Sequence, residues 1–239
     1  MRLSEHGLLI GDALLNWKAP PRITHTTLTG RFCRIEPLNA AKHAADLHAA
    51  NSLDATGEGW TYLASGPFAN FADYQTWAQK SEASVDPAFH ALIDLTTQKP
   101  VGVAAYMRID AEHGVVEIGN LRFSPLMQRT PVSTEAMYLM MKHVFTLGYR
   151  RYEWKCDTFN APSRRAAQRF GFSYEGVFRQ ATTYKNRTRD TAWYSIIDGE
   201  FPAIDAAFTQ WLAPENFDAQ GKQRVALSAL TGPLLKARG

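Results

Sequence analysis

Cysteine is scarce in this sequence, with Cys33 and Cys156 the only two among 239 residues. Their separation matches no metal or redox spacing, and Cys156 lies in an apolar, strand-like run, so we expect a buried reduced thiol and no metal site. Long apolar runs are also missing. No stretch approaches the ~20 apolar residues of a membrane span, and Glu5 and Asp12 interrupt the apolar run near the start, so no signal peptide is predicted. These absences favour a cytoplasmic protein without a membrane segment.

The chain has little net charge, but its basic residues are distributed unevenly along the sequence. The formal net charge is +3, and 45% of the residues are hydrophobic, enough for one substantial core. Basic residues gather between positions 164 and 189, which suits either a polyanion such as a nucleotide phosphate or nucleic acid, or only a solvated helix face. The length favours one domain with extensions: an arm over 1–30, a domain over 31–200, and a helix with a polar tail over 201–239. We expect residues 1–30 to lie on the domain.

Periodicity predicts alternating helices and strands in the second half of the chain. Helical spacing of apolar residues predicts helices over residues 41–50, 71–84, 130–147, 160–170 and 202–212. Apolar, β-rich runs predict strands over residues 31–36, 89–95, 101–107, 115–123, 150–157 and 191–197. Strands bunched in the middle and then alternating with helices predict the α/β class (α+β mixed), with a mixed sheet and helices packed on it.

The segment from 160 to 190 holds the most specific pattern. Asn160 opens a short helix, Ser163 follows one turn later, and the helix ends in Phe170-Gly171-Phe172, followed by Glu175-Gly176, Arg179 and Arg189-Asp190. Each feature alone is common, because any helix can have such a cap and such a stop. In combination they resemble the GNAT superfamily of N-acetyltransferases, most closely its RimJ/RimL-like branch. The resemblance covers residues 31 to about 200 and is sharpest from 115 to 198.

That resemblance implies fold, cofactor and reaction together. It implies a central, largely antiparallel sheet flanked by helices, with acetyl-coenzyme A (acetyl-CoA) as the cofactor. The reaction is then transfer of an acetyl group to a primary amine in a ternary complex. The acceptor is expected to be a protein or peptide N-terminus, and the protein a monomer or a homodimer. A small-molecule amine (an aminoglycoside, a polyamine or an amino acid) and a non-catalytic acyl-CoA-binding module stay open. A nucleic-acid binder ranks last, because no stacking aromatics interleave the basic residues.

The cofactor is expected where two helices begin. Thr130-Pro131 is a typical helix start, and free N–H groups at a helix N-terminus bind phosphate. The family's phosphate loop places small residues where this chain has Pro131 and Ser133, and Pro131 removes one backbone donor. Hydroxyl groups could replace it. The predicted cofactor-binding residues are Phe123, Gln128, Arg129, Thr130, Ser133, Thr134, Asn160 and Arg165.

Candidates for the chemistry follow from what acetyl transfer needs: a neutral amine, an oxyanion donor and a proton for the thiolate. Glu117, expected half-buried in the apolar strand 115–123, is the candidate base, or else a surface Glu paired with an Arg. The tyrosine that many GNAT enzymes use as acid is absent, because its position is Ala167, and Ser163 is the implied substitute. Trp60 and Tyr62 are candidates for acceptor binding, or else anchors of an irregular loop.

Overall fold

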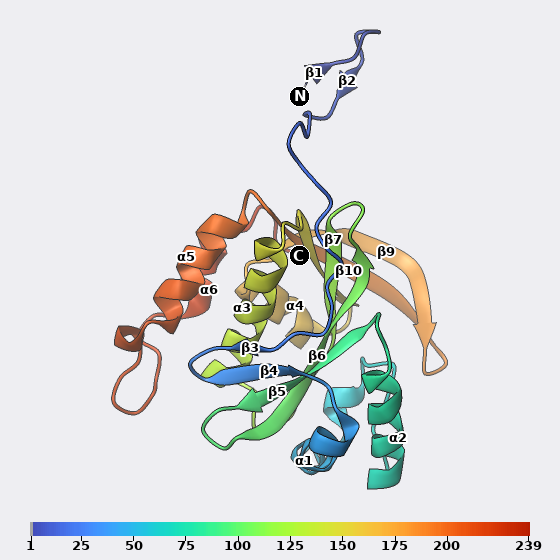
Figure 1. Cartoon of the computed structure of the whole chain (residues 1–239), viewed down its shortest axis with the longest axis vertical. Helices are drawn as coiled ribbons and strands as arrows, with labels where there is room; N and C mark the ends of the chain where they lie inside the picture. The colour runs from blue at the N-terminus through green and yellow to red at the C-terminus, as the bar shows by residue number, and fades with distance from the viewer. Residues whose placement is uncertain (1) are drawn as a thin grey trace.

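The computed structural model describes residues 2–239 and is built around one large sheet (Figure 1). Its eight strands run in the order β3-β4-β5-β6-β7-β8-β10-β9. All neighbours pair antiparallel except β7 and β8, which are parallel. The strands are β3 (Leu28–Thr29), β4 (Cys33–Pro37), β5 (Ala88–Asp94), β6 (Lys99–Asp110), β7 (Val115–Phe123), β8 (Arg151–Asp157), β9 (Ser173–Tyr184) and β10 (Arg187–Ile197).

Helices cover both faces of this sheet and create two cores. On one face α1 and α2 pack on β5 and β6, around Leu47, Trp60 and Tyr74. The other face carries the larger core, which includes Tyr106, Tyr152 and residues of α3, α4 and α5. The helices are α1 (Ala40–Ser52), α2 (Phe71–Glu82), α3 (Pro131–Thr146), α4 (Ala161–Arg169), α5 (Phe201–Leu212) and α6 (Leu227–Thr231). Within residues 2–239 no helix is both long and apolar enough to cross a membrane.

The mixed sheet and the predicted helices are confirmed, with ends that differ by a few residues. Asn39 caps α1 through a bond from the Lys42 N–H to its side chain (2.8 Å), and Asn70 caps α2 in the same way (3.0 Å to the Asp73 N–H). Strand β9 was missed. Most of its residues are exposed, so it lacks the alternation of apolar and polar residues that marks a half-buried strand.

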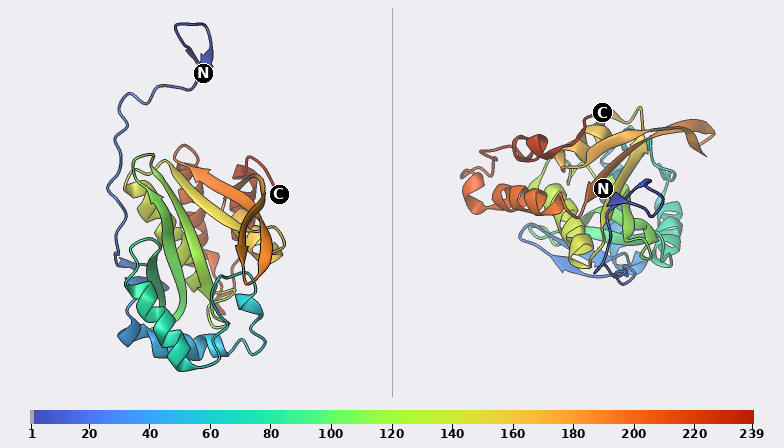
Figure 2. Two further views of the ribbon diagram at one scale, coloured as in Figure 1. Left: turned by 90° about the vertical axis from the view of Figure 1, so that its right-hand side faces the viewer. Right: turned by 90° about the horizontal axis from the view of Figure 1, so that it is seen from above.

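The N-terminal arm lies on the domain only in part. Burial of Pro20 and Ile23, and hydrogen bonds of Tyr149 with the Ile23 N–H and the Pro21 carbonyl (both 3.2 Å), fix residues 20–23 to the domain. Residues 2–12 instead project from it, with a short hairpin of β1 (Arg2–Leu3) and β2 (Leu9–Ile10) at the end (Figures 1 and 2). The expectation that the whole arm lies on the domain is therefore wrong for this hairpin.

The C-terminal segment packs against the domain although its sequence is polar. Leu227 is fully buried, and the Thr231 hydroxyl donates to the Arg169 carbonyl at the end of α4 (2.9 Å). Backbone contacts continue to the chain end, where the Tyr174 N–H donates to the Ala237 carbonyl (3.2 Å). A buried leucine and a few hydrogen bonds thus hold residues 227–237, which the sequence predicted to be part of a polar tail, against the domain.

His90 makes the stability of this fold depend on pH. Its ring is fully buried, with Nδ1 3.0 Å from the Ala88 carbonyl, and Nε2 accepts from the Thr26 N–H (3.4 Å). This pattern fits the neutral ring. Burial is the main cause that lowers the pKa of His90 to about 4, and the nearby His25 and His143 also lower it. The hydrogen bond to the Ala88 carbonyl acts in the opposite direction and raises the pKa.

We expect the free energy of unfolding to fall between pH 6.5 and about 4. In that range His90 is protonated in the unfolded chain but stays neutral in the folded chain. Stability is therefore lost as pH falls, by at most about 3 kcal/mol. Urea unfolding of wild type and His90→Gln at several pH values measures this difference. His113→Gln, at an exposed histidine, is the control and should keep the wild-type slope. An equal slope in His90→Gln would contradict the assignment.

Candidate active site

The central feature of the site is a fork between the two parallel strands. β7 and β8 pair only from Val115–Arg151 to Ile118–Trp154, although β7 continues to Phe123 and β8 to Asp157. Asn120 has a positive φ of 51°, and the register of β6 with β7 shifts on either side of this region. Such irregularities separate strands and leave backbone groups unpaired. The fork can therefore take up an extended molecule with amide groups of its own.

Asn160 lies just past the end of β8, at the start of α4. Its Oδ1 accepts from the Ser163 N–H (3.1 Å), and its own N–H donates to the Asp157 carbonyl (2.9 Å). Its side-chain NH₂ has no hydrogen bond to any of residues 2–239. The amide oxygen thus caps the helix that the sequence predicted to begin at Asn160, and the NH₂ group is left as a donor.

The start of α3 follows β7 across a tight loop. Residue 130 precedes the helix, but its hydroxyl donates to the Met127 carbonyl (2.7 Å) and does not cap α3, which corrects the expected cap. The Ser133 hydroxyl donates to the Thr130 carbonyl (2.9 Å), and the Thr134 hydroxyl accepts from Arg169 (3.1 Å). The hydroxyls of residues 130 and 133 therefore give their protons to the backbone. Phosphate binding here would rest on the free N–H groups of the first turn.

The remaining predicted cofactor residues surround that loop. Gln128 donates from its side chain to the carbonyl of Phe123 at the end of β7 (3.0 Å), so both residues shape the loop. Arg129 has a φ of 61°, in the left-handed region that glycine adopts most easily. Arg165 is exposed on α4, unlike Arg164, whose guanidinium bonds the Tyr194 hydroxyl (3.2 Å) and the Thr158 carbonyl.

A large cavity borders the same helix start on its other side. It measures about 500 Å³ and lies between the start of β4, the first turn of α3 and the C-terminal segment. Its walls include Phe32, Thr130, Pro131, Val132 and Phe217. The helix start thus stands between the fork and an open cavity, and none of the sequence patterns predicted this cavity.

Glu117 lies beside the fork in an ionic cluster with Arg108, Glu153 and Lys155. It is 3% exposed rather than half-buried, and its Oε2 lies 2.6 Å from Arg108 Nη1 and 3.0 Å from Lys155 Nζ. Lys155 Nζ also contacts Glu153 (2.7 Å) and stands 3.7 Å from the centre of the Trp193 ring. The expected half-burial is therefore wrong, and two cations accompany the carboxylate. The Arg108 side chain is 59% exposed and can move, whereas Lys155 is enclosed.

Ser163 points from α4 toward β8. Its hydroxyl accepts from the indole N–H of Trp154 (3.0 Å), the last residue of β8 that pairs with β7. The same hydroxyl is hydrogen-bonded to the Cys156 side chain, where it offsets part of the rise that burial causes in the pKa of that thiol. Ala167, at the position of the family's usual tyrosine, is fully buried and carries no acid.

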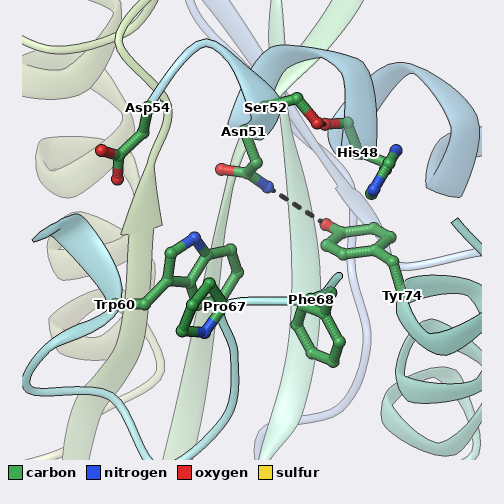
Figure 3. Close-up of a pocket in the computed structure, with 8 residues that line it drawn as sticks. All are labelled: His48, Asn51, Ser52, Asp54, Trp60, Pro67, Phe68 and Tyr74. Carbon is green, nitrogen blue, oxygen red and sulfur yellow. Dashed lines mark hydrogen bonds between the residues drawn. The ribbon is translucent and has the colours of Figure 1, made fainter. Parts of the chain in front are cut away.

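The loop over residues 54–69 covers the face of the sheet opposite α3 and α4. Trp60 is buried in its 3₁₀ helix (Glu58–Trp60) and helps to line a cavity of about 70 Å³ with Phe68, Tyr74 and Asn51 (Figure 3). Asn51 donates to the Tyr74 hydroxyl (3.4 Å), but its buried Oδ1 has no partner within residues 2–239. The cavity is therefore small and has one unsatisfied acceptor.

Three hydrogen bonds tie this loop to the opposite side of the fork. The Tyr62 hydroxyl donates to the Phe159 carbonyl (3.1 Å), and the tip of the β9–β10 hairpin supplies the other two bonds. There Lys185 Nζ donates to the Trp60 carbonyl (2.8 Å), and Arg187 donates to the Thr61 carbonyl (2.5 Å). Part of the basic cluster thus fastens the loop, and Tyr62 does not line the small cavity.

Arg122 and Lys155 hold this region together, and the sequence reasoning missed both. Arg122 is 4% exposed, contacts Asp54 Oδ2 (3.0 Å) and lies 4.5 Å above the Trp60 ring. A signal for Lys155 was present: charged residues alternate with Tyr152, Trp154 and Cys156 along β8, which places all the charges on one face. No group of three or more potential metal ligands occurs within the described chain.

Comparisons with known proteins agree with this arrangement. The family model for the acetyltransferase (GNAT) domain matches residues 33–173. The structure of a GCN5-related N-acetyltransferase from Brucella melitensis is 47% identical, covers 92% of this chain and 100% of its own, and superposes with a TM-score of 0.89. A probable acetyltransferase (GNAT family) from Chromobacterium violaceum is 36% identical, covers 82% and 98%, and has a TM-score of 0.76. No protein of curated function matches the chain.

The forked mixed sheet and its flanking helices are those of an acetyltransferase. The chain belongs to the GNAT family of acetyltransferases.

Proposed function

We propose that the protein is an acetyl-CoA-dependent N-acetyltransferase that modifies a protein or peptide N-terminus, as in the RimJ/RimL-like branch. The observation that carries the proposal is the fork between β7 and β8, with the spare amide donor of Asn160 at its mouth. The unpaired backbone of β7 and this amide match the amide groups of an extended pantetheine arm. The first-turn N–H groups of α3, with Arg129 beside them, suit its phosphates.

The chain's own residues then have distinct roles in the proposed transfer. The bound cofactor supplies the activated acetyl group, and the backbone N–H groups of β7 would stabilise the oxyanion. Ser163 would give a hydrogen bond to the leaving sulfur once its hydroxyl turns away from Cys156, while its oxygen still accepts from Trp154. Glu117 would take the amine proton, directly or through a water, once the exposed Arg108 moves aside.

The shape of the acceptor side favours a chain end over a small molecule. Small ligands are usually bound in pockets of roughly 300–1,000 Å³, but the cavity beside Trp60 has only about 70 Å³. The face of the sheet that carries Glu117 also holds the partly exposed charges of Arg108, Arg151 and Glu175. A polypeptide terminus can lie along such a face, with its first residue at the fork.

Asn160→Asp tests the cofactor site most directly. Aspartate keeps the oxygen that caps α4 but replaces the NH₂ donor, so we expect stability near wild type and acetyl-CoA affinity at least about tenfold weaker. Calorimetric titration with acetyl-CoA measures the affinity. Asn70→Ala is the control, because Asn70 caps α2 with the same geometry away from the fork and should not affect binding.

The titration also separates the parts of the proposal. No acetyl-CoA binding by wild type would overturn the cofactor assignment. Binding that Asn160→Asp leaves unchanged would overturn only the role of Asn160. With binding established, CoA release in the presence of short peptides or of small amines distinguishes the proposed acceptor from the alternative.

A further inference from the structure

The outer part of the N-terminal arm, residues 2–16, carries six of the fifteen large hydrophobic residues that are exposed among residues 2–239. Its six large aliphatic residues are 36–88% exposed: Leu3, Leu8, Leu9, Ile10, Leu14 and Leu15. Large apolar patches exposed together mark interaction sites. The arm also has a defined shape, because the Ser4 N–H donates to the Leu8 carbonyl (2.8 Å) and Gly7 turns with a φ of 74°. A hairpin this short is marginal in water without a partner.

We propose that this arm docks on a second copy of the chain and that strand β9 of that copy receives it. β9 is the outer strand of the large sheet, and its residues from Val177 to Thr183 are all exposed. Val177 is 40% exposed and Phe178 57% exposed, so the edge offers apolar contacts as well as free backbone groups. An exposed edge of this kind readily accepts a strand from another chain.

The direction of the arm favours a second copy over the arm's own domain. Residues 17–23 are fixed where β6 turns into β7 and β8 begins, through Arg22 on the Ile109 carbonyl (2.9 Å) and Trp17 beside Gly114. From there the arm leads away from its own sheet (Figure 2). A second copy related by twofold symmetry presents its β9 to the arm and sends its own arm back, so that each contact is made twice.

The area available is sufficient for a stable dimer. Six aliphatic side chains of roughly 100 Å² each, exposed by about 60% on average, present on the order of 400 Å² per arm. Two exchanged arms, with the surfaces that receive them, would bury roughly 1,600 Å², the usual size of a stable interface. The inference does not depend on the proposed acetyl transfer.

The mass of the purified full-length protein, by light scattering or sedimentation, tests the proposal. We expect a dimer for wild type and a monomer for the Leu9→Asp/Leu15→Asp double variant. Leu53→Asp/Val85→Asp is the matched control, because these residues are 57% and 71% exposed outside the arm, and it should stay dimeric. A monomeric wild type, or an arm variant that remains a dimer, overturns the proposal. The far-ultraviolet circular dichroism spectrum should be the same in all three, which shows that the domain stays folded.

Photo-crosslinking identifies what the arm contacts. Benzoylphenylalanine replaces Leu9 in a mixture of ¹⁴N- and ¹⁵N-labelled copies, and mass spectrometry then assigns each cross-link to one copy or to two. We expect mixed-label products at residues 173–184. Products within one copy alone overturn the proposal, as does the absence of any product. Mixed-label products elsewhere overturn β9 as the receiving edge.

Discussion

Arg122→Ala is expected to lower the free energy of unfolding by about 3 kcal/mol. The guanidinium is buried at the end of β7, paired with Asp54 (3.0 Å) and stacked above Trp60 (4.5 Å). Its removal leaves Asp54 with only the Gly59 N–H and the Thr56 hydroxyl as partners, and empties the space above the indole ring. Urea unfolding followed by circular dichroism measures the loss.

Two further variants separate charge from packing at this position. Arg122→Lys keeps the charge but loses the planar stacking, so an intermediate loss is expected. Asp54→Asn keeps a side chain of the same size but leaves the buried cation without its partner. Arg179→Ala, at an exposed arginine of β9, is the matched control and should change stability by less than about 0.5 kcal/mol. A loss below about 1 kcal/mol in Arg122→Ala would contradict the structural role given to the pair.

The loop over residues 54–69 should loosen in Arg122→Ala. The 3₁₀ helix that carries Trp60 contacts β7, and Arg122 is the β7 side chain stacked on this ring. In Arg122→Ala the loop keeps its bonds to Lys185 and Arg187 but loses its buried anchor. Faster hydrogen exchange over residues 54–69, with little change in α3, is therefore expected.

Local signals explain which elements could be predicted from the sequence. Strand 115–123 was predicted with its observed ends, and Asn39 and Gly148 mark helix ends that the structure has. Strand β9 could not be predicted, because a strand that is exposed on both faces does not alternate apolar and polar residues. The one signal in the sequence was Asn186, a residue type that hairpin turns favour; in the structure Lys185 and Asn186 have φ values of 49° and 56°, as in a two-residue hairpin loop.

The same distinction applies to the site. Asn160 and Ser163 could be predicted as neighbours, because residues three positions apart on a helix lie on the same face. In the structure the Ser163 N–H donates to Asn160 Oδ1. Pairing of Glu117 with an arginine was one of the two interpretations of the sequence, and Arg108 is that partner. The burial of Glu117 and its second partner could not be predicted, because Lys155 comes from β8, 38 positions further along the chain. Long-range partners of this kind decide whether a buried carboxylate is free or paired, and periodicity does not report them.

Substitution of Glu135 is expected to have the second large effect, because one side chain satisfies three backbone donors. Its carboxylate is 4% exposed and accepts from the N–H groups of Arg31 (2.8 Å), Phe32 (2.6 Å) and Cys33 (2.8 Å). These bonds join the second turn of α3 to the start of β4. Burial raises the pKa of the Cys33 thiol, and the adjacent carboxylate raises it further, so this thiol stays protonated.

Glu135→Ala should lower the free energy of unfolding by about 3–5 kcal/mol, because each buried N–H left without an acceptor costs roughly 1–3 kcal/mol. Glu135→Gln keeps one oxygen, which can still accept from Phe32 and Cys33, so about 1–2 kcal/mol is expected. Gly30→Ala should disrupt the same contact, because the added Cβ would lie 2.4 Å from the Glu135 carboxyl group and displace it. Glu112→Ala, at an exposed glutamate, is the control.

The order of these losses is what identifies the contact. In urea unfolding, Glu135→Ala should have a much lower free energy of unfolding than Glu135→Gln, and Glu112→Ala should equal wild type. Equal losses for Ala and Gln would mean that the charge matters and the three bonds do not. Because α3 also carries the first-turn N–H groups beside the fork, Glu135→Ala should weaken acetyl-CoA binding as well. Unchanged binding in a protein so destabilised would show that the start of α3 keeps its position without β4.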